Sequence, residues 1–229
     1  MEHRIRRIGE RMKKGLVRGA AVLTACLMLA GCGGHYSLED TGILVHKDGS
    51  VESAIYEDFD TNQFSIDALK SFAEQEVITY NQAEAGLSYA YADDEELETL
   101  ENAELSAWIN EVSEEDGKAI LKMSYASGED YVAFNDAEGN YTVLTCGTVS
   151  QASEQGVNLS GFVFHSEKEE DVPATALRDK WYYVYLQGAG QITVEGRICY
   201  LSDGLTMAED SKSMAVSESA ESPVCIIFK

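Results

Sequence analysis

Oxygen-bearing side chains alternate along Asp58-Phe59-Asp60-Thr61-Asn62, which supplies ligands at the first, third and fifth positions of a calcium loop. The remainder of that motif differs. Gln63 stands where the loop needs glycine, and Leu69 stands where it needs a bidentate glutamate. We therefore interpret Asp58 and Asp60 as turn residues that precede a helix, and we predict no metal site.

Sequence motifs of nucleophilic and phosphate chemistry are missing. The chain has no Gly-x-Ser-x-Gly elbow, no Ser-x-x-Lys, no Gly-x-x-x-x-Gly-Lys-Ser/Thr and no His-Glu-x-x-His. His35, His46 and His165 are scattered, and isolated histidines are more often structural than catalytic. A carboxylate-dependent hydrolase stays open because its acidic pair forms in space, but no pair stands out in the sequence. We assign no catalytic or cofactor-binding residue.

Three of the five cysteines, Cys146, Cys199 and Cys225, lie among apolar or β-favouring neighbours. Their odd number permits at most one disulfide among them. A reactive thiol needs an electropositive and partly exposed setting, and no basic cluster or histidine adjoins any of the three in sequence. We interpret them as small buried hydrophobes.

Cys32 is different, because it ends the segment Leu29-Ala30-Gly31-Cys32 behind an apolar stretch and a leader with seven basic and two acidic residues. This arrangement resembles the lipobox of bacterial lipoprotein signal peptides. Residues 20–30 are too short to span a bilayer, which takes ~20 apolar residues, so we expect export and cleavage. Leu23-Thr24-Ala25-Cys26 fits a looser lipobox, but cleavage there would leave an apolar start to the mature chain.

The resemblance implies that residues 1–31 are a lipoprotein signal peptide and that Cys32 carries a diacylglycerol thioether. Two acyl chains anchor a protein stably, at ~0.8 kcal/mol per buried methylene. We therefore expect the mature chain on the extracytoplasmic face of the cell membrane, with residues 32–41 as a lipid-anchored tether. An ordinary secreted protein is the alternative.

Processing would make an acidic chain more acidic. The remaining 198 residues carry 10 basic and 38 acidic residues, a formal net charge of −28 against −23 for the whole chain. Nucleic acid and anionic lipid surfaces need a basic partner, so both are excluded. Acidity attracts cations and cationic peptides over long range. Solubility and self-repulsion explain the charge more simply, and the charge alone defines no binding site.

Hydrophobic patterning predicts an α+β fold: antiparallel β-hairpins with one main amphipathic helix, followed by a β-rich C-terminal half. We expect hairpins around Lys47-Asp48-Gly49-Ser50 and Glu115-Asp116-Gly117-Lys118. Ser65 begins the main helix, whose apolar stripe runs to residue 81. A charged loop or short helix occupies 93–104, and a second short helix follows Ser127.

The later strands are expected at 141–149, 161–164, 181–186, 192–201 and 224–228, and a mobile loop at 211–222. Residues 42–156 thus form an α+β region and residues 157–229 a β-rich region. A boundary near residues 150–160 and a single antiparallel sheet shared by both regions are both compatible with the pattern.

Several segments together carry a wider resemblance: the lipobox, the 47–51 turn, Thr79-Tyr80-Asn81, residues 125–135 and Gly196-Arg197-Ile198-Cys199-Tyr200-Leu201-Ser202. In these segments the chain resembles a group of uncharacterised lipoproteins from Gram-positive gut bacteria. The resemblance implies a location and a fold but no activity. We expect a non-enzymatic binding or envelope-associated domain with a protein or cell-envelope partner. The alternatives are an extracytoplasmic hydrolase and a small solute-binding lipoprotein, for which 198 residues is short.

Overall fold

The computed structural model describes residues 36–61, 63–86, 105–135, 140–166, 170–208, 211–217 and 222–229. Several expectations lie outside these residues, namely the signal peptide with Cys26 and Cys32, the first part of the tether, Asn62 of the calcium-like segment and the acidic run at 93–104. Within the described residues, no helix combines the length and the apolar character that crossing a bilayer requires.

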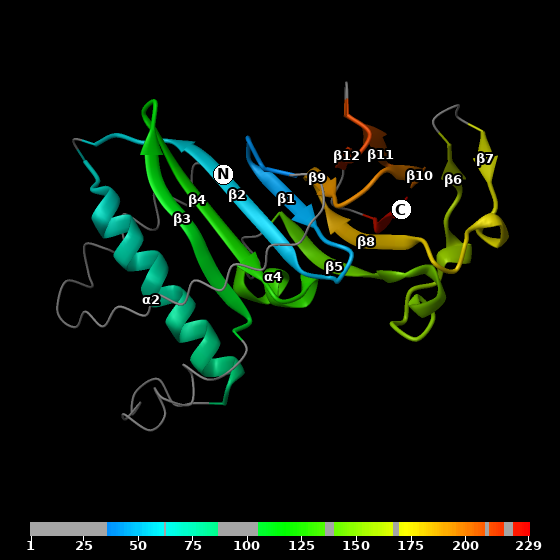
Figure 1. The fold of residues 1–229 in the computed structure, drawn as a ribbon, viewed down its shortest axis with the longest axis horizontal. Coiled ribbons are helices and arrows are strands. Elements are labelled where there is room, and N and C mark those ends of the chain that lie inside the picture. Colours follow the sequence, from blue (N-terminus) through cyan, green and yellow to red (C-terminus); the bar gives the residue numbers. More distant parts are fainter. Residues whose placement is uncertain are drawn as a thin grey trace.

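The described chain forms two β-sheets and two α-helices, so the α+β class is confirmed (Figure 1). Sheet A has seven strands, in the spatial order β11 (Leu205–Met207), β12 (Met214–Ser217), β9 (Gly190–Val194), β1 (Gly42–Val45), β2 (Val51–Asp58), β4 (Lys118–Tyr125) and β3 (Ala107–Glu115). Sheet B has six, in the order β5 (Tyr141–Thr148), β8 (Tyr182–Gly188), β13 (Val224–Phe228), β10 (Ile198–Ser202), β6 (Phe164–His165) and β7 (Asp171–Val172).

Sheet A combines strands from both ends of the sequence. β1 pairs antiparallel with β2 and parallel with β9, in the register Ile43↔Ile192 and Val45↔Val194. All other strand pairs in the described residues are antiparallel. The structure therefore has two sheets instead of one shared antiparallel sheet, and sheet A takes strands from both sides of residue 157.

Helix α2 (Ile66–Glu84) begins where its cap predicts, because Ser65 Oγ accepts the Ala68 N–H at 3.4 Å. Its apolar stripe buries Leu69, Ala73 and Val77, and the helix runs beside β3 in Figure 1. The shorter α4 (Gly128–Asn135) starts at Ser127, whose Oγ accepts the Asp130 N–H at 3.0 Å. Short 3₁₀ turns occupy Val149–Gln151, Leu159–Gly161 and Ala174–Ala176.

The main core lies between the two sheets. Its contributors from sheet A include Ile43, Val45 and Ile192, and those from sheet B include Leu186 and Phe228. A second core covers the opposite face of sheet B, where Tyr183, Cys225 and Ile227 pack with Phe164 and Leu177. β13 is buried on both faces for that reason, and its sequence is an uninterrupted apolar run.

The expected strand at 192–201 is wrong. Residues 190–194 belong to sheet A and residues 198–202 to sheet B, and the chain crosses between the sheets at residues 195–197. Gly196 makes the crossing possible, because a Cβ there would collide with the carbonyl oxygen of Lys229. An apolar period-two pattern continues through the crossing, since both segments are buried strands.

The expected loop at 211–222 is also wrong in part, because it contains β12. Ala215 and Ser217 face the interior and are buried, and Ser217 Oγ donates to the Gly188 carbonyl at 2.6 Å. The residues of this segment are mostly small or polar, so its composition favoured a loop and did not indicate the strand. The expected strand at 161–164 reduces to Phe164 and His165 in β6, preceded by a 3₁₀ turn.

Asn81 ties α2 to the start of β3. It is 4% exposed; its Nδ2 donates to the Ala107 carbonyl at 2.7 Å, and its Oδ1 accepts the N–H groups of Ser106 at 2.9 Å and Ala107 at 3.0 Å. Ser106 lies just before β3, so Asn81 and not a neighbouring strand accepts its N–H group. Asn81 therefore joins the helix to the edge strand of sheet A.

Replacing Asn81 should cost about 2–4 kcal/mol in the free energy of unfolding, because Asn81→Ala leaves buried backbone groups unpaired. Chemical denaturation of the two proteins measures the difference. Thr79→Ala is the matched control on the same helix, since Thr79 is exposed and bonds only within the helix, and it should change stability by less than about 0.5 kcal/mol. Equal effects of the two substitutions would contradict this role.

Candidate functional site

The face of sheet A that points away from the main core, here called the outer face, carries several interacting polar side chains. Alternation places Leu44, Glu52 and Ser124 on it, because their neighbours Val45, Val51 and Tyr125 face the core. Trp108 pairs with Ser124 and shares this face. One transverse row thus runs from Trp108 through Ser124, Glu52 and Leu44 to Thr193.

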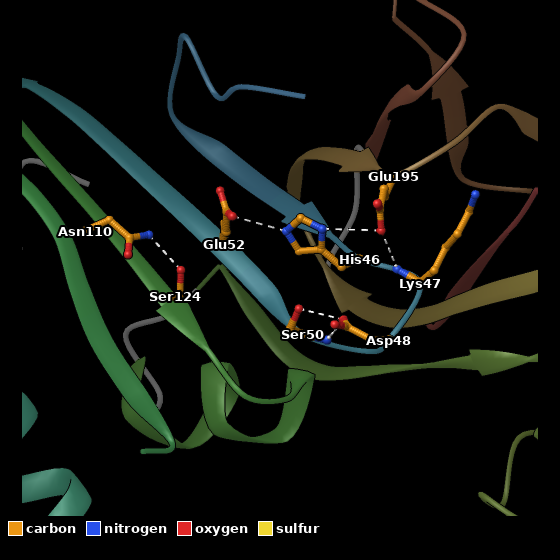
Figure 2. Close-up of polar contacts among 8 residues, drawn as sticks. All are labelled: His46, Lys47, Asp48, Ser50, Glu52, Asn110, Ser124 and Glu195. Carbon is orange, nitrogen blue, oxygen red and sulfur yellow. Dashed lines mark hydrogen bonds and ion pairs between the residues drawn. The ribbon is translucent and has the colours of Figure 1, made fainter. Parts of the chain in front are cut away.

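His46 lies just beyond the end of β1, between two carboxylates (Figure 2). Its Nε2 is 3.3 Å from Glu52 Oε1 of β2, and its Nδ1 is 3.5 Å from Glu195 Oε2 at the crossing between the sheets. Glu195 also accepts the Lys47 N–H at 3.0 Å. We call His46, Lys47, Asp48, Ser50, Glu52 and Glu195 the His46 cluster.

Electrostatics favour a charged imidazole in this cluster. The hydrogen bond with Glu52 raises the pKa of His46 above its usual value, burial opposes the change, and the charges of Glu52, Glu195 and Asp48 add to it. Asp48 accepts the Ser50 N–H at 2.9 Å and the Ser50 hydroxyl at 2.7 Å. Although burial disfavours the Asp48 anion, these bonds lower the pKa of Asp48.

The polar contacts continue toward the edge of the sheet. Asn110 sits at a β-bulge in β3, and its Nδ2 donates to Ser124 Oγ at 2.7 Å (Figure 2). Lys122 pairs with Glu111 at 2.9 Å and lies 6.0 Å from the ring centroid of Tyr56. The side chains of this face are thus held by one another, across β2, β3 and β4.

His165 repeats the chemistry of His46 in sheet B. Its Nε2 is 2.8 Å from Asp203 Oδ1 and its Nδ1 is 3.1 Å from Asp171 Oδ1. The hydrogen bond with Asp203 and the charges of Asp203 and Asp171 raise the pKa of His165. Both aspartates are highly exposed, so solvent screens these ion pairs strongly.

The sequence identified the two histidines as structural but gave no partners for them. Glu52 was detectable, because a hairpin in register around the 47–50 turn puts residues 46 and 52 on the same face. Glu195 and Asp203 carried no such signal, since they join through pairing between distant segments. Cys32, the predicted site of lipid attachment, lies outside the described residues.

Asp60 lies in the turn ahead of α2, where its carbonyl accepts the N–H groups of Gln63 and Phe64 at 3.0 Å. Asp58 ends β2, and Asp60 Oδ2 accepts the side-chain amide of Gln63 at 2.6 Å. Across the described part of the chain, no group of three or more His, Cys, Asp and Glu side chains is arranged to hold a metal ion.

The aromatic run Trp181-Tyr182-Tyr183 divides between the two cores, as alternation along β8 requires: Trp181 and Tyr183 pack in the second core and Tyr182 packs against the main core. Tyr183 is fully buried in the second core, whereas Tyr182 is half-buried and packs on Phe228. Lys47 Nζ lies 5.7 Å from the centroid of the Tyr182 ring.

Comparison of the chain with protein-family models, with curated proteins and with solved structures gave no match. Its class is therefore the one that the fold itself defines, an α+β protein with two packed sheets. The residues and contacts of this chain are the basis for its function.

The thiols of Cys146 and Cys225 are unsuited to nucleophilic chemistry. Burial raises the pKa of Cys146 to about 12, helped by the charge of Asp48, and burial alone raises the pKa of Cys225 further. At pH 8 the thiolate fraction of Cys146 is then about 10⁻⁴. The interpretation of these residues as small packing groups is confirmed for Cys225, which is fully buried.

Alkylation should show this low reactivity. With iodoacetamide at pH 8, Cys146 and Cys225 of the folded protein should react at least about a hundredfold more slowly than the same thiols in urea. Peptide mass spectrometry at several times measures both rates for each residue. Rapid modification of folded Cys146 would show an exposed, activated thiol and contradict the structure.

Proposed function

We propose that the chain is a lipid-anchored lipoprotein on the extracytoplasmic face of the membrane, with a domain that binds a partner in the cell envelope and performs no catalysis. The outer face of sheet A is the observation that carries the proposal. It carries the indole of Trp108, the amide of Asn110 and both signs of charge, and the amide and the charged groups are held by the contacts described above. Fixed polar groups around aromatic residues suit recognition, because little side-chain order is lost on binding.

The position of this face relative to the anchor supports the proposal. Leu38 is buried against Leu44 and Ala54 on the outer face, and its carbonyl accepts the Tyr56 hydroxyl at 2.9 Å. Leu38 is six residues after Cys32 in the sequence, and an extended chain of that length reaches at most about 22 Å. A lipid on Cys32 would therefore hold Leu38, at the outer face, within about 22 Å of the bilayer.

A carboxylate hydrolase fits these sites less well. The neighbouring acidic pairs, Glu52 with Glu195 and Asp171 with Asp203, each flank an imidazole. Glycoside hydrolysis needs one of its two carboxyl groups protonated, to serve as the acid. An imidazolium between two carboxylates stabilises the negative charge of both, which is the opposite requirement.

Lipidation should depend on Cys32 and not on Cys26. In a Gram-positive host, the wild-type chain should fractionate with membranes and begin at Cys32 with the mass of a diacylglycerol, because two acyl chains anchor stably. Cys32→Ala should be released or left unprocessed, whereas Cys26→Ala, the matched control, should behave as wild type. Intact-mass analysis of the fractions measures this. A soluble, unmodified wild-type chain would refute the anchor.

Partner binding should depend on Trp108. Trp108→Ala should lower retention of an envelope component by about tenfold or more, as loss of a central tryptophan does at other interfaces. The readout is affinity capture from envelope extract, followed by the Kd for the captured component. Trp181→Ala is the control, because Trp181 packs on Tyr200 beside the second core. Equal loss in both variants, or no captured component, would contradict the assignment.

A further inference from the structure

His46 sits where the hairpin of β1 and β2 meets a segment from much later in the sequence. It belongs to the turn between β1 and β2, Glu52 belongs to β2, and Glu195 belongs to the crossing from sheet A to sheet B. A backbone hydrogen bond joins the same two segments, because the Glu195 N–H donates to the Val45 carbonyl at 2.9 Å. The strands on either side of β1 are β2 and β9. The imidazole lies at the end of β1 and contacts Glu52 of β2 and Glu195, which directly follows β9 (Figure 2).

Proton counting shows what this geometry requires. An ionised carboxylate only accepts hydrogen bonds, and a neutral imidazole has one N–H donor and one lone pair. A neutral His46 therefore donates to Glu52 or to Glu195 and turns a lone pair toward the other carboxylate. Nε2 is within hydrogen-bond distance of Glu52, and Nδ1 forms an ion pair with Glu195 at 3.5 Å. Only the imidazolium, with an N–H and a share of positive charge at each nitrogen, is attracted to both carboxylates.

We propose that His46 is a proton-operated clasp, which in its doubly protonated form joins β2 to the crossing between the sheets and which releases one carboxylate when it loses a proton. Loss of the proton leaves Asp48, Glu52 and Glu195 around an uncharged ring. Mutual repulsion of the three carboxylates then favours opening of the turn. The inference concerns this chain's conformation and does not depend on the proposed partner.

The other groups around His46 do not replace the lost charge. From β5, Cys146 Sγ donates to the His46 carbonyl at 3.5 Å, and burial keeps that thiol neutral. Lys47 gives its backbone N–H to Glu195, while its ammonium lies over the Tyr182 ring of β8. Asp48 is bound by Ser50 and adds negative charge. The imidazolium is the positive group between Glu52 and Glu195.

The direction of the pH effect follows from the raised pKa of folded His46. The clasp contributes its full stabilisation below the pKa of an unfolded histidine, about 6.5, and loses it as the pH rises through the folded pKa. Opening is therefore expected on the alkaline side. His165 has the same two-carboxylate geometry, but its aspartates are exposed and it joins the short β6–β7 hairpin to the turn after β10.

Amide hydrogen exchange of the full-length chain at pH 5.5 and pH 8.5, corrected for intrinsic rates, tests the clasp. The informative amides are those of Lys47, which donates to Glu195, and of His46 and Gly49, which bond within the turn. Their opening constants should rise about tenfold in wild type between the two pH values, because the attraction between the imidazolium and the two carboxylates is lost. Unchanged opening in wild type would overturn the proposal.

Variants separate the clasp from a general effect of pH. His46→Gln should open the turn equally at both pH values, because glutamine gains no proton. Glu195→Gln should keep it closed at both, since the amide offers a donor to the neutral ring and an acceptor to Lys47. His165→Gln, the matched control, should retain the wild-type response. A pH response that persists in His46→Gln, or one lost in His165→Gln, would overturn the assignment.

Discussion

β1 is the strand on which the rest of the structure depends. It is only four residues long, yet it is hydrogen-bonded on both sides, to β2 after it in sequence and to β9 almost 150 residues later. Ile43, Leu44 and Val45 are each at most 2% exposed. Burying such side chains contributes about 1.5–3 kcal/mol each. Because β9 then leads directly into β10 of sheet B, β1 also holds one of the connections between the two sheets.

The sequence predicted those parts of the fold whose information is local. Ser65 and the apolar stripe after it located α2, and the α+β class was correct. It failed where pairing partners are distant. The parallel pair of β1 and β9 has no local signature, and the apolar run at 192–201 concealed a change of sheet at Gly196. Composition also misled, since β12 is held by two neighbouring strands and not by bulky side chains of its own.

The contacts of the candidate site likewise fall into those that the local sequence predicts and those that only the tertiary structure creates. A histidine before an Asp-Gly turn and a glutamate after it lie on one face as soon as the hairpin forms, so the pair of His46 and Glu52 follows from local pattern. His165 and Asp171 are likewise direct neighbours across β6 and β7. The second carboxylate of each cluster arrives through tertiary structure, at Glu195 and Asp203. Because of these second carboxylates, each histidine pairs favourably with both of its acidic neighbours only when its imidazole is protonated.

The acidity of the chain gives this arrangement a physical reason. With 40 acidic and 17 basic residues, folding necessarily brings carboxylates close to other carboxylates. A lysine or arginine would relieve that repulsion at every physiological pH, whereas a histidine relieves it only when protonated. The two clusters differ in burial, and His46 is the better shielded, so its charge acts more strongly on its neighbours. His46, which lies next to β1, is therefore the histidine whose protonation state affects the crossing between the two sheets at residues 195–197.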